Sequence, residues 1–320
     1  MQERKPTPNG VRDAADRIAG QVTCTPLLPL DRGGRRTWIK AECLQQGGSF
    51  KLRGATNRLA QMNADERARG VVAFSSGNHA QGVALAARRL GIAATIVMPA
   101  DAPAVKVAAT RAAGAEILFY DRATESREEI AARLAAERGA TLVPSFDDVD
   151  IIEGQGSVGV EIEAQLGRAP EHLLVPCGGG GLAAGIALAL PATTVTIVEP
   201  EGWDDMARSL AAGRIVPVEE PAPPTRCDAL QTKRVSPLTF GALREAGAHG
   251  VAVSEAEIAE AMAFAFGNLR IVAEPGGAVA LAALLSGRAG DLPDGSVVVV
   301  SGGNIDPGLY AEILRDASAG

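Results

Sequence analysis

Aromatic residues are scarce in this chain of 320 residues, where they make up only 3% of the sequence. Alanine and glycine are abundant instead, so we expect a core of small aliphatic side chains in which backbones approach each other closely. The chain also has no surplus of positive charge, because 31 Lys and Arg stand against 38 Asp and Glu, a net charge of −7. A nucleic acid is therefore excluded as the main partner, since phosphate binding needs a basic face.

Cysteine pairs and long apolar runs are missing as well. The four cysteines, Cys24, Cys43, Cys177 and Cys227, form no CxxC pair, which argues against a metal or redox motif and against a disulfide scaffold. The N-terminus has no apolar segment of the signal-peptide kind, so we expect a cytoplasmic protein. The uncharged stretch 173–198 contains four consecutive glycines and two prolines, which a membrane-spanning helix would not tolerate. We therefore predict no membrane partner.

Strands and helices alternate between residues 71 and 143, which predicts βαβ units and a parallel sheet. Short apolar runs are typical of strands, and the segments between them end at glycines that can terminate helices. Ser126 and Glu129 have the spacing of a capping box. The predicted strands are 71–74, 94–98, 116–120 and 141–143, and the predicted helices are 80–90, 102–113 and the one that Ser126 caps.

A second alternation begins at residue 173, with a strand, four glycines, a helix and another strand at 195–198. Ser254 and Glu257 form a further capping box, which predicts a helix after Ser254. The run Val297–Val300 is β-branched throughout and is typical of a strand buried on both faces. Two α/β units of unequal size follow, with a boundary near residues 144–150.

Four loops contain reactive or polar groups that the fold alone does not explain. In loop 47–55, Lys51 follows a glycine pair, and such a lysine can form a Schiff base with a carbonyl. Loop 75–80 opens a helix, whose free N–H groups suit a carboxylate. The four glycines 178–181 allow successive N–H groups to converge on a phosphate. Loop 301–304 places polar groups at the carboxyl end of the buried strand.

The glycine run also fits a dinucleotide-binding fingerprint. Gly179, Gly181 and Ala184 have the required spacing, and Glu199 could bind a ribose hydroxyl. An NAD(P)-dependent oxidoreductase is therefore an alternative, whereas a P-loop NTPase is excluded because no GK[ST] follows the glycines. The oxidoreductase would use only one of the four loops. A cofactor with both a phosphate and an aldehyde would use all of them.

With these motifs the chain resembles the fold-type II pyridoxal-phosphate enzymes, and among them the threonine and serine dehydratases and the serine racemases. The resemblance rests on segments 48–55, 75–79, 154–156, 178–181, 274–278 and 301–304, which occur in the family's order. It implies a tryptophan synthase β-like α/β fold, a homodimer, and two parallel-type domains with the cofactor in the cleft between them. The implied large domain comprises residues 1–56 and 145–320, and the small domain comprises residues 57–144.

The resemblance implies pyridoxal 5'-phosphate as the cofactor and gives the loops their roles. Lys51 holds the cofactor's aldehyde carbon and removes the Cα proton, and Ser76 matches the second acid/base of racemases. Asn78 contacts the ring hydroxyl, and Ser301 contacts the ring nitrogen. The residues implied for the cofactor are Phe50, Lys51, Asn78, Gly178, Gly179, Gly180, Gly181, Leu182 and Ser301. Those implied for the substrate carboxylate are Ser75, Ser76, Asn78 and His79.

The implied activity is that of a dehydratase, or ammonia-lyase, which converts serine, threonine or a related β-hydroxy amino acid to a 2-oxo acid and ammonia. A neutral Ser301 at the ring nitrogen makes the ring a weaker electron sink, which favours loss of a β-hydroxyl over transamination. Asp228-Ala229-Leu230 has alanine where the family usually has glycine. A racemase, or a dehydratase of 3-hydroxyaspartate or of the hydroxyectoine pathway, therefore stays open, with the oxidoreductase as a distant alternative.

The segment 199–205 is similar to the one that binds Mg²⁺ or Ca²⁺ in serine racemases. The ligands that this similarity implies are Glu199, the Trp203 carbonyl and Asp205. Oxygen ligands suit such hard cations. A solvated acidic turn is the alternative interpretation of this segment.

Overall fold

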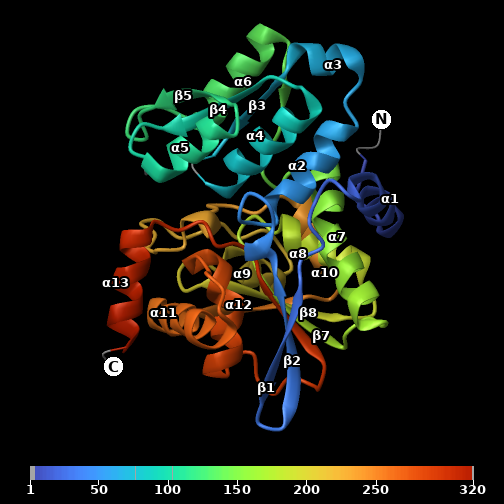
Figure 1. Ribbon diagram of the computed structural model, residues 1–320, viewed down its shortest axis with the longest axis vertical. Coiled ribbons are helices and arrows are strands. Elements are labelled where there is room, and N and C mark those ends of the chain that lie inside the picture. Colours follow the sequence, from blue (N-terminus) through green and yellow to red (C-terminus); the bar gives the residue numbers. More distant parts are fainter. Residues whose placement is uncertain (1–3, 76, 103, 319–320) are drawn as a thin grey trace.

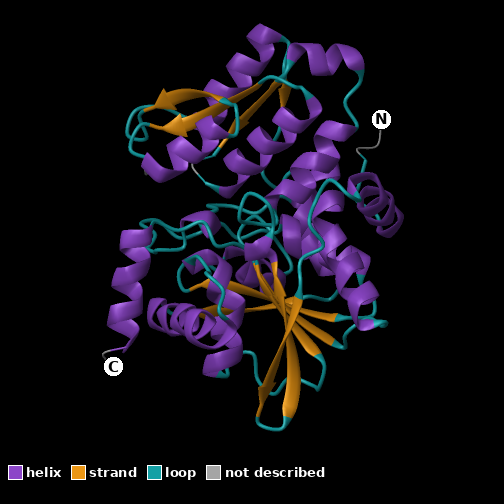
Figure 2. Cartoon of the chain, in the orientation of Figure 1, coloured by secondary structure: helices purple, strands orange, loops and turns teal. Residues whose placement is uncertain are grey.

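The computed structural model describes residues 4–75, 77–102 and 104–318. They form two α/β units stacked one above the other, with the N-terminus beside the upper unit and the C-terminus at the lower one (Figure 1). Loops gather between the two sheets (Figure 2). Within the described residues, none of the helices has the length and apolarity needed to cross a membrane.

The upper unit contains a parallel sheet of four strands in the order β5-β4-β3-β6. Alternate side chains of β3 face opposite sides: Val71 and Ala73 pack in a core with α4, and Val72 packs in a core with α6. Helices therefore cover both faces, as expected for βαβ units. The strands are β3 (Val71–Phe74), β4 (Ala94–Pro99), β5 (Glu116–Tyr120) and β6 (Thr141–Leu142), and the helices are α3 (Ala64–Arg69), α4 (Asn78–Leu90), α5 (Ala104–Ala112) and α6 (Arg127–Arg138).

The lower unit contains a sheet of six strands in the order β1-β2-β10-β7-β8-β9. All neighbours are parallel except β1 and β2, which are antiparallel. Val298 and Val300 of β10 face the core with α11 and α12, whereas Val297 and Val299 face the core with α7 and α8. The strands are β1 (Leu27–Arg32), β2 (Arg35–Ala41), β7 (His172–Pro176), β8 (Thr194–Pro200), β9 (His249–Val253) and β10 (Ser296–Val300).

The remaining helices surround the lower sheet or connect it to the upper unit. They are α1 (Pro8–Ile18), α2 (Lys51–Ala60), α7 (Val149–Leu166), α8 (Gly181–Ala189), α9 (Asp205–Ala212), α10 (Pro237–Glu245), α11 (Glu255–Phe264), α12 (Pro275–Ser286) and α13 (Pro307–Ser318). Two short 3-10 helices, η1 (Glu42–Leu44) and η2 (Asp228–Leu230), and a π-helix, η3 (Ala265–Leu269), complete the set. The small sheet lies wholly within residues 71–142, and the large one takes strands from both sides of that segment.

The structure corrects a few local predictions. The helix expected at 102–113 is α5, which covers only Ala104–Ala112. Ser126 accepts a bond from the Glu129 amide, but the reciprocal bond of a capping box is not formed there. At Ser254 and Glu257 both bonds of the box are present. The four valines of β10 are fully buried, which confirms a strand covered on both faces. The domain limits at residues 56 and 144 stay a prediction.

Candidate active site

A cleft of about 950 Å³ opens between the two units, and a smaller cavity of about 40 Å³ adjoins it. Both are lined by Lys51, Asn78, Phe146 and Ala229. Every residue that the resemblance implied for the cofactor lines the smaller cavity. Of the residues implied for the substrate, Ser75, Asn78 and His79 line the larger cleft, whereas Ser76 lies outside the described residues.

Lys51 begins α2 at a point where two distant loops pair with each other. The Phe50 amide donates to the Ser301 carbonyl (3.2 Å), and the Gly303 amide donates to the Gly48 carbonyl (2.9 Å). A single β-bridge between Ser49 and Gly302 lies between these bonds. The loop after β10 therefore fixes the chain immediately before Lys51.

The Lys51 amine is held inside the site. Its Nζ donates to the Ser145 carbonyl (2.9 Å) and lies 5.1 Å from the centre of the Phe50 ring. Burial lowers the pKa of Lys51 to about 8, because the charged form is poorly solvated. A substantial fraction of the amine is thus neutral near pH 8, and the neutral amine is the form that attacks an aldehyde carbon.

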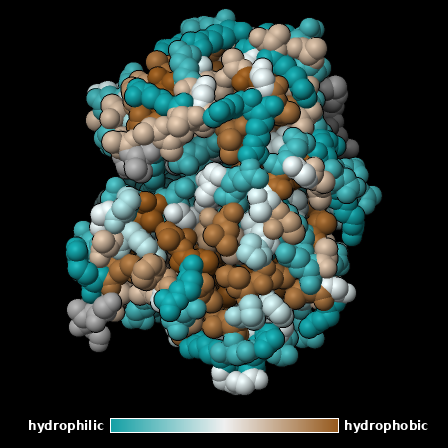
Figure 3. All heavy atoms as spheres, viewed as in Figure 1, coloured by the Kyte–Doolittle hydropathy of each residue, from teal (hydrophilic) through white to brown (hydrophobic). Residues whose placement is uncertain are grey.

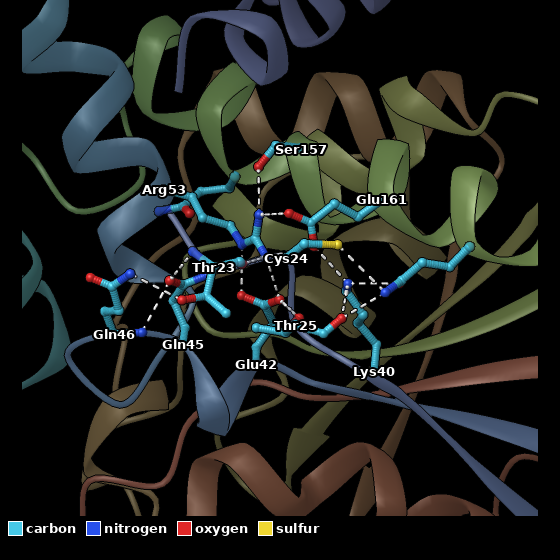
Figure 4. A network of polar contacts seen from close by, with 12 residues as sticks. Thr23, Cys24, Thr25, Lys40, Glu42, Gln45, Gln46, Arg53, Ser157 and Glu161 are labelled. Atoms are coloured by element: carbon cyan, nitrogen blue, oxygen red, sulfur yellow. Dashed lines mark hydrogen bonds and ion pairs between the residues drawn. The ribbon is translucent and has the colours of Figure 1, made fainter. Parts of the chain in front are cut away.

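A buried network of charges anchors the helix that carries Lys51 (Figure 4). The Arg53 guanidinium donates to both carboxylate oxygens of Glu42 (2.7 and 2.8 Å) and to both of Glu161 (2.6 and 2.8 Å). Lys40 also donates to Glu161 (2.6 Å). Arg53 and Lys40 are fully buried, and their partners come from η1 and α7. The network therefore ties α2 to β2 and α7, two residues after Lys51.

Helix α4 approaches α2 closely because Gly82 has no side chain. A Cβ at Gly82 would lie 2.9 Å from the Lys51 carbonyl carbon, closer than ordinary contacts allow. The first turn of α4 thus comes beside Lys51 and presents Asn78 to the site. Asn78 donates from its amide nitrogen to Glu274, and its amide oxygen accepts from Asn304 (2.8 Å).

Two titratable groups of the site are neutral at pH 7. Burial and the charge of Lys51 lower the pKa of His79 to about 3. His79 Nε2 donates to the Val143 carbonyl (2.9 Å), and Nδ1 has no partner among the described residues. Burial and repulsion by Asp228 raise the pKa of Glu274 to about 8. His79 therefore offers a free acceptor, and Glu274 is protonated.

In the glycine loop 178–181, side chains in place of the glycines would collide with neighbouring residues. A Cβ at Gly179 would lie 2.2 Å from the Phe146 ring, and one at Gly180 would lie 2.6 Å from Met206. Gly180 also has a positive φ of 85° and caps α8 without a side-chain hydrogen bond. Free amides at a helix N-terminus are suited to a phosphate, so the loop fits the phosphate end of the implied cofactor.

The segment implied for a metal lines neither cavity. Glu199 accepts from the Met206 (3.3 Å) and Ala207 (2.8 Å) amides, while Asp205 Oδ2 accepts from the Val235 amide (3.0 Å). The described residues contain no group of three or more His, Cys, Asp or Glu side chains that could hold a metal, so the magnesium or calcium prediction gains no support from such a cluster. Glu199 is also fully buried and lines neither cavity, so the structure gives no support to it as the ribose ligand of an oxidoreductase.

Three residues of the site were assigned no role from the sequence. Glu274 belongs to segment 274–278 of the family resemblance, but that resemblance gave it no role. Nothing in the sequence indicated a role for Phe146 apart from the scarcity of aromatic residues. Lys106 of α5 is buried and pairs with Asp228, and its Nζ would lie 3.8 Å from a Cβ at Gly77. No local pattern indicates this pair, because α5 and η2 meet only in the folded chain.

The chain is similar over most of its length to known proteins of one family. The family model described as pyridoxal-phosphate dependent enzyme matches residues 18–303. An L-threo-3-hydroxyaspartate ammonia-lyase from Pseudomonas sp is 44% identical over 310 residues, which cover 94% of this chain and 96% of the relative. The structure of maize serine racemase has a TM-score of 0.91 at 35% identity and covers 99% of both chains. The structure of a threonine deaminase from T.th. has a TM-score of 0.86 at 43% identity, with 94% of this chain and 99% of that one covered. The fold is therefore that of fold-type II, and the chain belongs to the family of pyridoxal-phosphate dependent enzymes.

Proposed function

We propose that the protein is an ammonia-lyase that converts a β-hydroxy amino acid to a 2-oxo acid and ammonia. The observation that carries the proposal is that Lys51, the glycine loop 178–181 and Ser301 line one small cavity beside a much larger cleft. The substrate loses its Cα proton and its β-hydroxyl as one water, and a second water releases ammonia. The 2-oxo acid and ammonia together therefore contain all the atoms of the substrate.

The residues that line the smaller cavity, where it adjoins the larger cleft, would hold pyridoxal 5'-phosphate. The amides of 178–181 and Leu182 would bind its phosphate, Phe50 would pack on its ring, and Ser301 would contact the ring nitrogen. When bound, the cofactor supplies the electron sink that makes the Cα proton acidic. The lowered pKa of Lys51 supports its role as the base that accepts this proton at Nζ, with the Ser145 carbonyl orienting the amine.

The larger cleft would bind the amino acid. The first turn of α4, with Ser75 and Asn78, suits the α-carboxylate, because helix N-termini favour anions. The tautomer of His79 suggests a different role from the carboxylate contact first expected. Its free Nδ1 accepts a hydrogen bond, so it suits the ammonium or hydroxyl group of the substrate better than a carboxylate.

The proposed function is tested with a panel of β-hydroxy amino acids that includes serine, threonine and L-threo-3-hydroxyaspartate, the substrate in the name of the Pseudomonas relative. We expect a yellow protein that releases a 2-oxo acid from at least one of them, and K51A to lose both the visible absorbance and the turnover. A purified protein that binds pyridoxal phosphate but releases no 2-oxo acid from the panel contradicts the proposal.

A serine racemase is the second candidate, favoured by the likeness to the maize enzyme. Ser76 would then serve as the second acid/base that the resemblance implies, and this role stays a prediction because Ser76 lies outside the described residues. Chiral chromatography of a serine incubation decides between the two activities. D-serine formed faster than pyruvate favours the racemase, and pyruvate without D-serine favours the lyase.

We also propose a Mg²⁺ or Ca²⁺ ion bound by Glu199, Asp205 and the Trp203 carbonyl. Its support is that Asp205 Oδ1 is buried without a hydrogen-bond partner among the described residues, beside a second buried carboxylate. Burial raises the pKa of Glu199, and repulsion by Asp205 raises it further. A cation would relieve this repulsion and would occupy the free oxygen of Asp205. We expect Mg²⁺ or Ca²⁺ to raise the melting temperature of the protein but not that of D205N. An equal rise in both proteins contradicts the site.

A homodimer is proposed as the assembled state. Leu44, Phe266 and Val272 are exposed large hydrophobic residues of the lower unit, and apolar side chains gather on that unit in the face that Figure 3 shows. Light scattering on the purified protein measures the assembly directly, and a monomeric mass at micromolar concentration contradicts it. A cytoplasmic location stays a prediction.

A further inference from the structure

We propose that Arg234 binds a carboxylate on the side chain of the substrate, so that the preferred β-hydroxy amino acid has two acidic groups. This inference rests on the proposed ammonia-lyase function and names its substrate class. It starts from the charges that line the larger cleft, whose cations are Lys51, Arg127, Lys233 and Arg234.

Three of these four cations already have partners. Lys51 donates to the Ser145 carbonyl (2.9 Å). Arg127 donates to Glu128 (2.8 Å) and lies over the Phe74 ring at 5.6 Å. Lys233 pairs with Glu220 (2.8 Å). Within the described residues, Arg234 has no hydrogen bond, ion pair or ring contact, and its side chain is exposed to the cleft.

The acidic residues of the cleft leave the charge of Arg234 uncompensated. Asp228 pairs with Lys106, Glu128 pairs with Arg127, and Glu274 is bound by Asn78. Only Asp147 lacks a partner among the described residues, and it lies in the lining without an ion pair to Arg234. A guanidinium free of intramolecular partners is suited to bidentate binding of a carboxylate from outside.

The position of Arg234 suits a group beyond Cβ of the substrate. It follows the segment 228–232, which lines both cavities and contacts the glycine loop, where a Cβ at Gly178 would lie 3.0 Å from Leu230. A cleft of about 950 Å³ also leaves space beyond a molecule the size of serine. We therefore infer that Arg234 contributes to substrate selectivity and not to the bond-breaking steps.

Threonine and L-threo-3-hydroxyaspartate form a matched pair for the test, because one has a methyl group where the other has a carboxylate. The measured quantity is the ratio of kcat/KM for 3-hydroxyaspartate to kcat/KM for threonine, with the holoenzyme. We expect R234Q to lower this ratio by about tenfold or more, which corresponds to about 1.4 kcal/mol, because the substrate carboxylate loses its charged hydrogen-bond donors. R234K keeps the positive charge but loses the paired N–H donors of the guanidinium, so it should lower the ratio less than R234Q does.

Two control variants make the result specific. K233Q removes the neighbouring cation, which is already paired with Glu220, and should leave the ratio unchanged. D147N removes the free carboxylate of the cleft and should raise the ratio, because it no longer repels a dicarboxylate. An unchanged ratio in R234Q overturns the inference, and so does a D147N variant that lowers the ratio as R234Q does, because Arg234 would then act through Asp147.

Failure of the inference is distinct from failure of the proposed function. If the wild-type protein turns over threonine and R234Q leaves the ratio unchanged, the lyase function is retained but the proposed role of Arg234 is overturned. If the wild-type holoenzyme releases no 2-oxo acid from serine, threonine or 3-hydroxyaspartate, the proposed function is overturned and the inference with it. If it acts on serine or threonine but not on 3-hydroxyaspartate, the lyase function is retained and the role of Arg234 is overturned.

Discussion

Glu274 accepts a hydrogen bond from the side-chain amide of Asn78, which joins the start of α12 to the first turn of α4. Asn78 is 196 residues away in the sequence, and both side chains are buried. Burial and the nearby Asp228 raise the pKa of Glu274 to about 8. The two units of the protein are therefore connected at the cleft by a carboxyl group that is neutral at pH 7.

This protonation makes the contribution of Glu274 to stability depend on pH. Between the unfolded pKa of about 4.3 and the folded value of about 8, the folded state binds more protons, so the contribution decreases as the pH rises. E274Q keeps an acceptor for Asn78 but cannot ionise. We expect the free energy of unfolding of E274Q, relative to wild type, to rise between pH 5 and pH 9, as measured by urea denaturation. Parallel profiles for the two proteins contradict the raised pKa.

The lowered pKa of Lys51 predicts the reactivity of its amine. In cofactor-free protein, we expect modification of Lys51 by an acylating reagent to follow a titration with a midpoint near pH 8. A lysine in a short unstructured peptide, with the reference pKa of about 10.4, is the control. Mass spectrometry after brief labelling at several pH values, followed by digestion of the protein, measures both amines in one sample. Coincident curves for Lys51 and the peptide lysine would mean that burial does not act on the amine.

The glycine at position 180 is predicted to be needed for cofactor binding. G180A costs about 1–2 kcal/mol for a left-handed alanine and also crowds Met206 and Thr239. We expect its affinity for pyridoxal phosphate to fall by about tenfold or more, which corresponds to about 1.4 kcal/mol. G213A is the matched control, because Gly213 also has a positive φ but has no described atoms near its added Cβ. Equal cofactor affinities of the two variants contradict the prediction.

The network around Arg53 is predicted to be important for stability. Removing one partner of a buried ion pair leaves uncompensated charge, so we expect R53M to lose about 3–5 kcal/mol of unfolding free energy. Arg36 forms a solvent-exposed pair with Asp31, so R36M should lose much less unfolding free energy than R53M. Chemical denaturation of both variants measures the difference. Similar losses would show that burial does not strengthen the network.

Most local structure could be predicted from the sequence because it depends on neighbouring residues. The strand Val71–Phe74 has the bounds predicted for it, and Gly91 ends α4 in the left-handed conformation as expected. The predicted helix at 102–113 was too long, because apolar content alone does not define where a helix begins. The prediction of a full capping box at Ser126 was wrong for a related reason. The spacing of Ser126 and Glu129 permits both reciprocal hydrogen bonds but does not ensure that both form.

The sequence by itself determined the family, because six motifs in order are specific even though each is short. It also pointed, through the family resemblance, to nine of the residues that line the smaller cavity, since they belong to loops that follow a strand or precede a helix, but it missed Phe146. Only the tertiary structure decided the electrostatic state of the site. The neutral Glu274 and His79, the Lys106–Asp228 pair and the Arg234 side chain, which has no partner among the described residues, depend on burial and on charges from distant segments. Solvation and Coulomb energies follow distances in space, and the order of residues along a chain does not contain those distances.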